Sequence, residues 1–315
     1  MATVTAAAAE KAPAATGDRF RLLTGLTGLA APLALLLIVA VLVQQAWPAI
    51  TRFGWPFLVG REWDPVHTHF GALPFIYGTV VTAFLALAMA LPIGIGVAVF
   101  LAEQSAARVR GAIGIGVELL AAIPSVVYGL WALFVMGPFV FKYLETPIAD
   151  RAGWIPIFAG PARPTAMFTA DLILAVMILP TLASVSRDVI RAVPGGLREA
   201  STALGATWWE TTWRVILPAA RAGIIGAVIL ALGRALGETI AVTMTIGNRN
   251  QISASLFEPA YSLAAVIANE FTEATGPLHS AALVELGLVM IAVTLAVNLL
   301  ALGLLRVSGL APKPA

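Results

Sequence analysis

The chain has 315 residues, of which 59% are hydrophobic and only 11% are charged. Soluble domains carry about 25% charged residues, so this composition excludes a protein whose surface lies mostly in water. The formal net charge of +2 gives no indication of nucleic-acid binding, and the absence of cysteine excludes disulfides and thiolate metal sites.

The N-terminal segment 1–22 is rich in alanine and polar residues, which predicts a disordered cytoplasmic tail. The next apolar run, 25–46, is open to two interpretations. A cleaved signal peptide is one, but the run is longer than a typical signal core and no A-x-A site closes it convincingly. We therefore interpret it as an uncleaved first membrane helix, within a segment 23–74 that also holds an external loop.

Five further apolar segments are each about long enough to cross a bilayer, which takes about 20 residues. They are residues 75–102, 112–136, 167–186, 223–247 and 281–305. Three contain proline (Pro92, Pro124, Pro180), which membrane helices tolerate when neighbouring helices satisfy the freed carbonyls. Closely spaced glycines, in 94–96 and 111–116, predict faces on which helices pack tightly. The predicted fold is all-α, with six transmembrane helices, a core over 75–306 and a short tail, 307–315.

Lys and Arg set the predicted orientation, because cytoplasmic loops carry more of them. With the N-terminus inside, twelve of the 19 lie on the cytoplasmic side, six lie outside, and Arg234 falls within a span. The cytoplasmic set is Lys11, Arg19, Arg21, Arg108, Arg110, Arg187, Arg191, Arg198, Arg214, Arg221, Arg306 and Lys313. Both termini and segment 187–222 are therefore predicted to be cytoplasmic.

The predicted external stretches are 47–74, 137–166 and 248–280. They contain Trp47, Trp55, Trp63 and Trp154. These aromatic residues either anchor surface helices at the lipid interface or belong to a docking platform for a partner that delivers substrate, and the two interpretations are compatible. The histidines are too few and too scattered to predict a metal site.

A polar island, residues 195–218, interrupts the apolar pattern. Pro194 and two glycines break the chain, a short helix is predicted over 197–204, and Gly205 suits the left-handed position after its end. Thr207 and Glu210 have the spacing of a capping box for a second helix. In that helix Trp209, Trp213 and Ile216 are predicted to share one face at the lipid interface.

This island resembles the EAA loop of type I ABC importer permeases. Glu199, Ala200, Gly205, Leu217 and Pro218 match the loop's pattern, whereas Ser201 and Val215 replace an alanine and an isoleucine. The resemblance implies the type I permease fold, with the loop acting as the coupling helix that inserts into an ATPase subunit. The alternative is an ordinary amphipathic helix at the membrane surface.

The chain itself has no P-loop, because none of its three lysines follows a glycine. We therefore expect no catalytic residue and no bound cofactor here, with ATP and magnesium held by a partner ATPase.

Charged residues within the predicted spans are candidates for a substrate path or gate, because charge is costly in the bilayer. Arg234 and Glu238 are four residues apart, which on one helix would place them on one face. They either form a self-neutralising pair, or Arg234 binds a passing oxyanion with Glu238 or Glu118 as its resting counter-ion. Asp171 and Glu285 lie near the predicted outer boundary and are expected to snorkel to the surface.

Three longer stretches, 70–79, 122–129 and 233–244, resemble the PstC family of phosphate ABC importer permeases. The resemblance implies a multi-pass protein of the bacterial inner membrane that takes up inorganic phosphate. Its implied partners are a PstA-like second permease, two ATP-binding subunits, an external phosphate-binding protein and membrane lipid, but no nucleic acid. The alternatives are a permease for sulfate, molybdate or another solute and, less in keeping with the pattern, a secondary transporter.

Overall fold

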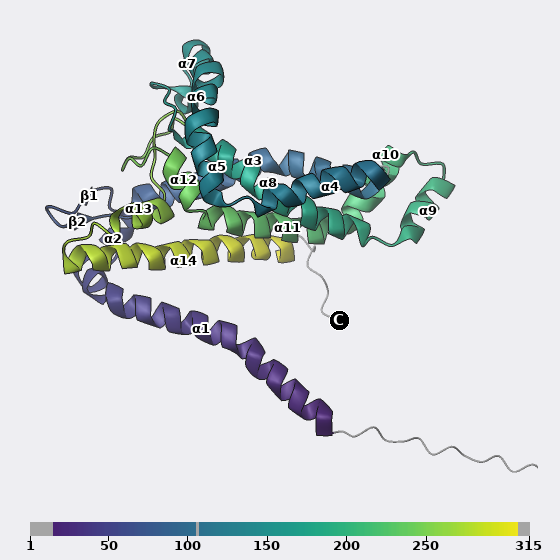
Figure 1. The fold of residues 1–315 in the computed structure, drawn as a ribbon, viewed down its shortest axis with the longest axis horizontal. Helices are drawn as coiled ribbons and strands as arrows, with labels where there is room; N and C mark the ends of the chain where they lie inside the picture. Colours follow the sequence, from purple (N-terminus) through teal and green to yellow (C-terminus); the bar gives the residue numbers. More distant parts are fainter. Residues whose placement is uncertain (1–14, 105–106, 308–315) are drawn as a thin grey trace, which may run out of the picture.

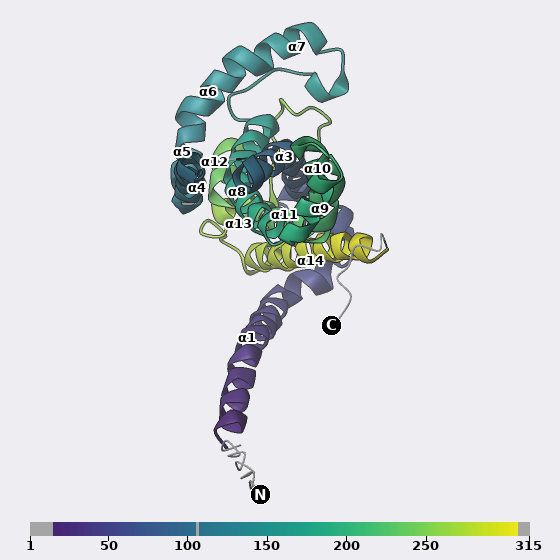
Figure 2. The same ribbon diagram turned by 90° about the vertical axis from the view of Figure 1, so that its right-hand side faces the viewer.

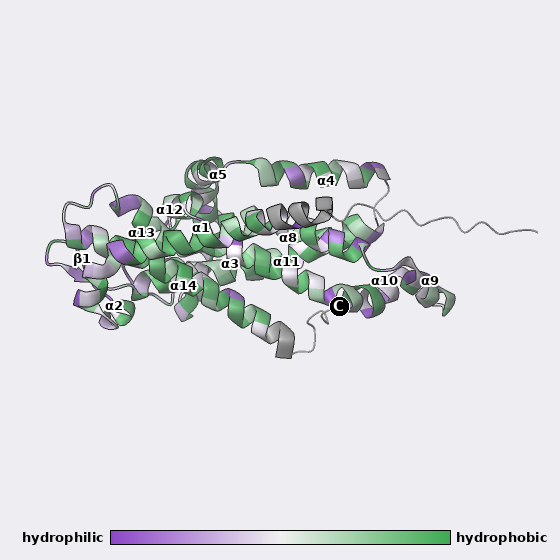
Figure 3. Cartoon of the chain, turned by 90° about the horizontal axis from the view of Figure 1, so that it is seen from below, coloured by the Kyte–Doolittle hydropathy of each residue, from purple (hydrophilic) through white to green (hydrophobic). Residues whose placement is uncertain are grey.

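The computed structural model describes residues 15–104 and 107–307 as a bundle of long helices with a small two-stranded sheet at one end (Figure 1). The long helices are α1 (Ala15–Phe53), α3 (Leu73–Val99), α8 (Met167–Arg191), α11 (Leu217–Gly237) and α14 (Pro277–Val307). Within the described residues, six helical stretches are long and apolar enough to span a membrane. Most of their residues are hydrophobic (Figure 3), and many of their large hydrophobic side chains are exposed.

The first, second, fourth and sixth predicted spans are confirmed as single long helices. Helix α1 begins at Ala15, inside the segment predicted to be a tail. The rest of the two predicted tails, 1–14 and 308–315, lies outside the described residues.

The third predicted span, 112–136, is wrong as a single helix. It breaks at Pro124, whose ψ of 142° is extended, and the break separates α4 (Ala107–Ala122) from α5 (Ser125–Trp131). Proline lacks an amide donor and disfavours helical geometry in the residue before it. Beyond α5 the chain continues through wider π-helical turns at 132–136 and 141–145 into α6 (Gly137–Val140) and α7 (Thr146–Ala152). This continuous segment stands at a steep angle to α4 (Figures 1 and 2).

Small side chains fill the centre of the bundle, where α3, α8 and α11 meet. Ala83, Ala86, Ala170 and Ala227 are fully buried in one cluster. Close packing of this kind holds membrane helices together where the hydrophobic effect does not act between them. The predicted glycine faces are confirmed at Gly94, which lies against Leu182, and at Gly114, where an added Cβ would lie 3.7 Å from Arg187; Cβ atoms at Gly96, Gly111 and Gly116 would meet open space.

Gly78 of α3 allows the backbone of another segment to approach the helix closely, and a substitution can test this. A Cβ at Gly78 would overlap the backbone carbonyl of Tyr261, which cannot rotate away. We expect Gly78→Ala to destabilise the protein by about 1–3 kcal/mol or more, as overpacking does, and to lower its unfolding temperature in detergent. Gly96→Ala on the same helix is the matched control, because its methyl group enters open space. Equal unfolding temperatures for the two variants would contradict this close approach.

The two ends of the bundle carry different structures. At one end lie α2 (Pro56–Val59), α13 (Leu263–Glu270) and the antiparallel strands β1 (Trp63–Asp64) and β2 (His69–Phe70). Trp63 Nε1 donates to Glu270 at 2.7 Å there, and the Phe70 ring stacks on His279. At the other end lie α9 (Gly195–Ala203) and α10 (Trp208–Thr211) (Figure 1). The EAA-like loop is therefore on the opposite side of the bundle from the sheet.

Candidate coupling loop and substrate path

As far as its capping box, the loop folds as its sequence predicts. Helix α9 begins directly after Pro194 and ends at Ala203. Gly205 then adopts φ +85°, the left-handed geometry expected after a helix end. The predicted capping box is also present: the Thr207 hydroxyl accepts from the Glu210 amide at 3.3 Å, and the Glu210 carboxylate accepts from the Thr207 amide at 2.9 Å.

The residues that match the EAA pattern at the tip of the loop face outward. Glu199, Ala200 and Gly205 are exposed, and Leu204 beside them is 89% exposed. No other described part of the chain covers them, so this tip is free to contact another protein. Leu217 and Pro218 instead lie at the start of α11, directly after the π-helical turn at 212–216 and within one continuous helical stretch, Trp208–Gly237.

Ser201, one of the two departures from the EAA pattern, has a structural role. Its Oγ lies 2.9 Å from Thr211 Oγ1, which joins α9 to α10. An alanine could not make this bond. The serine therefore stabilises the fold of the loop without changing its exposed tip.

Arg198, at the base of α9, makes contacts that the sequence did not indicate. Its guanidinium donates to the Glu103 carboxylate, with Nη2–Oε1 at 2.6 Å. It also donates to the carbonyls of Val193 at 2.6 Å and Ile190 at 3.0 Å. The hydrogen bond to Glu103 is the main cause that raises the pKa of Arg198 above its ordinary value, so this cation keeps its charge. Glu103 lies 95 residues earlier in the chain, and only the fold brings the two together.

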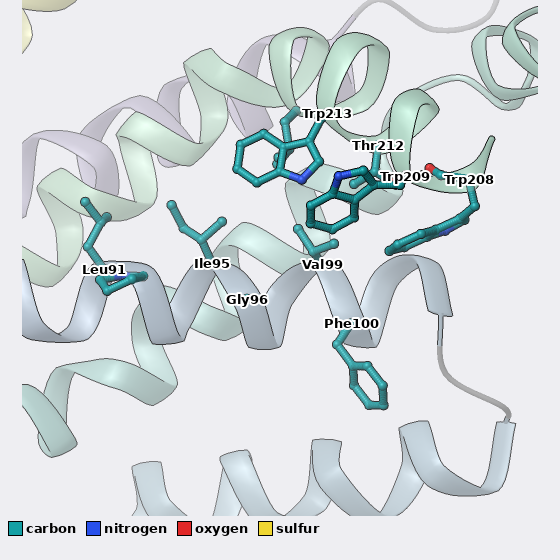
Figure 4. A pocket seen from close by; sticks show the side chains of 11 residues that line it. Leu91, Ile95, Gly96, Val99, Phe100, Trp208, Trp209, Thr212 and Trp213 are labelled. Carbon is teal, nitrogen blue, oxygen red and sulfur yellow. Dashed lines mark hydrogen bonds between the residues drawn. The ribbon is translucent and has the colours of Figure 1, made fainter. Parts of the chain in front are cut away.

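A cavity of about 640 Å³ separates α3 from the start of the second loop helix. Leu91, Ile95 and Val99 project into it from α3, opposite Trp209 and Trp213, whose ring centroids are 5.4 Å apart (Figure 4). Its lining is almost entirely apolar.

The prediction that Ile216 shares the face of the two tryptophans is wrong. A π-helical turn at 212–216 adds a residue to the helix and rotates the residues after it. Ile216 is therefore buried against Ala98 and Ile190, whereas Trp209 and Trp213 stay exposed.

Arg234 and Glu238 do not share a helix, which contradicts the predicted spacing on one face. Helix α11 ends at Gly237, and Glu238 has an extended backbone, with ψ 128°, before α12 (Ile240–Thr245). The described part of the chain contains no ion pair between the two. Arg234 is exposed and lines an open pocket with Thr181 and Asn298. Glu238 instead lines a small internal cavity with Thr82 and Ser262.

The other acidic candidates are distributed differently from the prediction. Glu118 is exposed on α4 and forms no ion pair among the residues described here. Asp171 and Glu285 are buried inside the bundle, so the expectation that they snorkel to the surface is wrong. Glu145 is also fully buried, where its Oε1 accepts from Thr169 Oγ1 at 3.3 Å. The sequence placed Glu145 in an external stretch and gave no signal of this burial.

Comparison with known proteins places these features in a family. Residues 90–309 match the model of the family described as the binding-protein-dependent transport system inner membrane component. The phosphate transport system permease protein PstC of Mesorhizobium japonicum is 47% identical over 275 residues, which cover 85% of this chain and 84% of that protein. The corresponding protein of Pasteurella multocida is 44% identical, covering 82% and 83%.

Solved structures show the same fold at low sequence identity. A bacterial alginate ABC transporter, in complex with a pentasaccharide-bound periplasmic protein, contains a chain that matches with a TM-score of 0.61 and 16% identity, covering 92% of this chain and 96% of that one. An inward-facing MetNI methionine ABC transporter matches with a TM-score of 0.52 and 20% identity, covering 73% and 94%.

These matches agree with the six apolar helices and the exposed loop. The protein is a multi-pass inner-membrane transport subunit with the type I ABC permease fold, of a family whose transport depends on a binding protein. The chain belongs to the family of binding-protein-dependent transport system inner membrane components.

Proposed function

We propose that this chain is a permease subunit of an ATP-driven importer of inorganic phosphate. The observation that carries the proposal is the similarity, along 85% of the chain, to a protein named as a phosphate transport permease. The complex would contain a PstA-like second permease, two ATP-binding subunits that hold ATP and magnesium, and an external phosphate-binding protein.

The loop at residues 195–218 is the proposed contact with an ATPase subunit. Its tip is exposed, and its shape is fixed by Gly205 and the capping box, as a rigid knob requires. The excess of Lys and Arg on this side supports a cytoplasmic location for the loop and for both termini. ATP binding would draw the loops of the two permeases together and open the path outward, and hydrolysis would reset it inward.

Arg234 is the proposed contact for the passing anion. Its exposed guanidinium presents planar donors that suit phosphate oxygens. Glu238 lies beyond the end of α11 and forms no ion pair with Arg234. The Arg234 guanidinium is therefore not neutralised by Glu238 in this conformation. Glu238 and Glu118 are then candidates to line or gate the path.

Reconstitution of the four kinds of subunit in lipid vesicles tests this function. We expect phosphate-loaded binding protein to stimulate ATP hydrolysis and phosphate uptake together. Sulfate and molybdate, supplied with their own binding proteins, are the controls for a different solute. Stimulation by one of these pairs and none by phosphate would reject the phosphate assignment, and uptake that needs no ATP would reject the importer itself.

A further inference from the structure

Arg198 connects three parts of the fold through one side chain. It belongs to α9, it donates to the carbonyls of Ile190 and Val193 at the end of α8, and it binds Glu103 just beyond the end of α3. Its Nε lies 3.2 Å from both Glu103 oxygens, in addition to the 2.6 Å contact of Nη2. Only a guanidinium, with donors in a planar fork, can make all of these bonds at once.

This cluster is largely withdrawn from solvent. The Glu103 side chain is 8% exposed and that of Arg198 is 27% exposed. Ion pairs on an open surface contribute little because water and salt screen them. Removal of one partner from a shielded, multiply hydrogen-bonded pair is strongly destabilising, because the other charge is left buried and unpaired. Separation of Arg198 from Glu103 is therefore costly, whereas the exposed tip of α9 has no such contact among the described residues.

The turn that follows α3 makes contacts with both α8 and α9. Residues 100–104 form a π-helical turn that carries Glu103, and a second arginine, Arg191 of α8, donates to the Leu101 carbonyl in the same turn at 3.0 Å. Helix α3 then runs back through the bundle with α8 and α11 packed against it. A displacement of α9 thus has a direct polar route into the transmembrane core.

The geometry points to Arg198 as a positioning residue that transmits movement of the coupling loop to α3. This inference rests on the proposed function, since the loop moves only if ATPase subunits act on it. Glu103 is the receiving group, and the two carbonyls hold the guanidinium in place. The Ser201–Thr211 contact provides a separate connection from α9 to α10, so loss of Arg198 leaves the loop folded and still packed against α3 through Ile216, but without the polar contact between α9 and Glu103.

The test compares energy use with transport in the reconstituted complex. In Arg198→Gln we expect ATPase subunits to remain bound and stimulated hydrolysis to stay within about twofold, while phosphate taken up per ATP falls at least tenfold. Arg198→Lys keeps the charge but loses the planar fork of donors, so we expect an intermediate amount of phosphate taken up per ATP. Arg221→Gln is the control, because Arg221 is an exposed arginine of α11 that forms no ion pair within the described residues.

The double variant Glu103→Gln/Arg198→Gln keeps the test available if the single variant fails to assemble. It removes the buried unpaired carboxylate, and two amide side chains can still form a hydrogen bond. If the pair acts as one unit, the double variant should lose no more coupling than Arg198→Gln alone. Additive losses would overturn the inference, because they would mean that the two residues act separately.

A second readout does not depend on phosphate. Addition of ATP should change amide hydrogen exchange at residues 95–103 in the unsubstituted complex and not in the complex that carries Arg198→Gln. An unchanged uptake per ATP in Arg198→Gln would overturn the inference. A fall in uptake that only matches a fall in the amount of bound ATPase would also overturn it. A contact that merely keeps the loop folded would give that result. Failure of the unsubstituted complex to import phosphate would reject the proposed function, while the exchange measurement would still decide the role of Arg198.

Discussion

Complexes carrying Arg234→Gln are expected to lose phosphate uptake by about ten- to a hundredfold. Hydrogen bonds to charged groups contribute about 1.5–3 kcal/mol, which corresponds to that range. Glutamine keeps a polar side chain, but it is shorter and loses the charge and the planar fork. Arg234 is exposed on α11, so the substitution leaves no buried group without a partner and should not impair folding.

The measurement is the initial rate of labelled phosphate uptake into vesicles, at fixed amounts of binding protein and ATPase. Arg234→Lys is the matched variant, and it should retain part of the activity because it keeps the charge. Glu238→Gln distinguishes two possible roles of the Glu238 carboxylate. If the carboxylate repels the anion, its removal leaves uptake unchanged or raises it. If the carboxylate gates the path, its removal lowers uptake. A normal rate in Arg234→Gln would remove Arg234 from the path.

The second large effect is expected at the tip of the coupling loop. Glu199→Lys combined with Gly205→Val should abolish co-purification of the ATPase subunits. The first change reverses the charge of an exposed anchor. The second places a β-branched residue at φ +85°, where left-handed geometry costs about 1–2 kcal/mol or more, so the end of α9 would refold.

Gly196→Val is the control for the glycine substitution. Gly196 also lies in α9, and a Cβ there meets nothing within 4 Å, but its backbone does not have a positive φ. We expect this variant to retain the ATPase. Full assembly and transport by the Glu199→Lys/Gly205→Val protein would exclude the loop as the ATPase contact.

Local signals predicted the coupling loop well because its structure is determined by neighbouring residues. The left-handed Gly205 and the Thr207–Glu210 box each depend on a few consecutive positions. The long apolar helices could also be predicted from the sequence, because a helix in lipid requires a continuous run of apolar residues.

Features that depend on helix continuity were not predictable in the same way. Pro124 ends a helix, but Pro92 and Pro180 lie inside intact ones, and packing decides between these outcomes. The π-helical turns leave no clear pattern in the sequence, so the face of Ile216 was predicted wrongly. The contact of Arg198 with Glu103 joins distant segments, and no local spacing could reveal it.

The end of α11 at Gly237 has a consequence for hydration. The final carbonyls of a helix lack intrahelical donors, and an unpaired carbonyl in hydrocarbon is costly. Here the Glu238 amide bonds Ala235 O at 3.4 Å and the Thr239 hydroxyl bonds Gly237 O at 3.3 Å, both long contacts. These carbonyls can therefore accept further hydrogen bonds, from water or from a transported ion's hydration shell, at a point inside the span. An ion that arrives there can exchange its hydration shell in steps, instead of shedding it all at once on entering a dry channel.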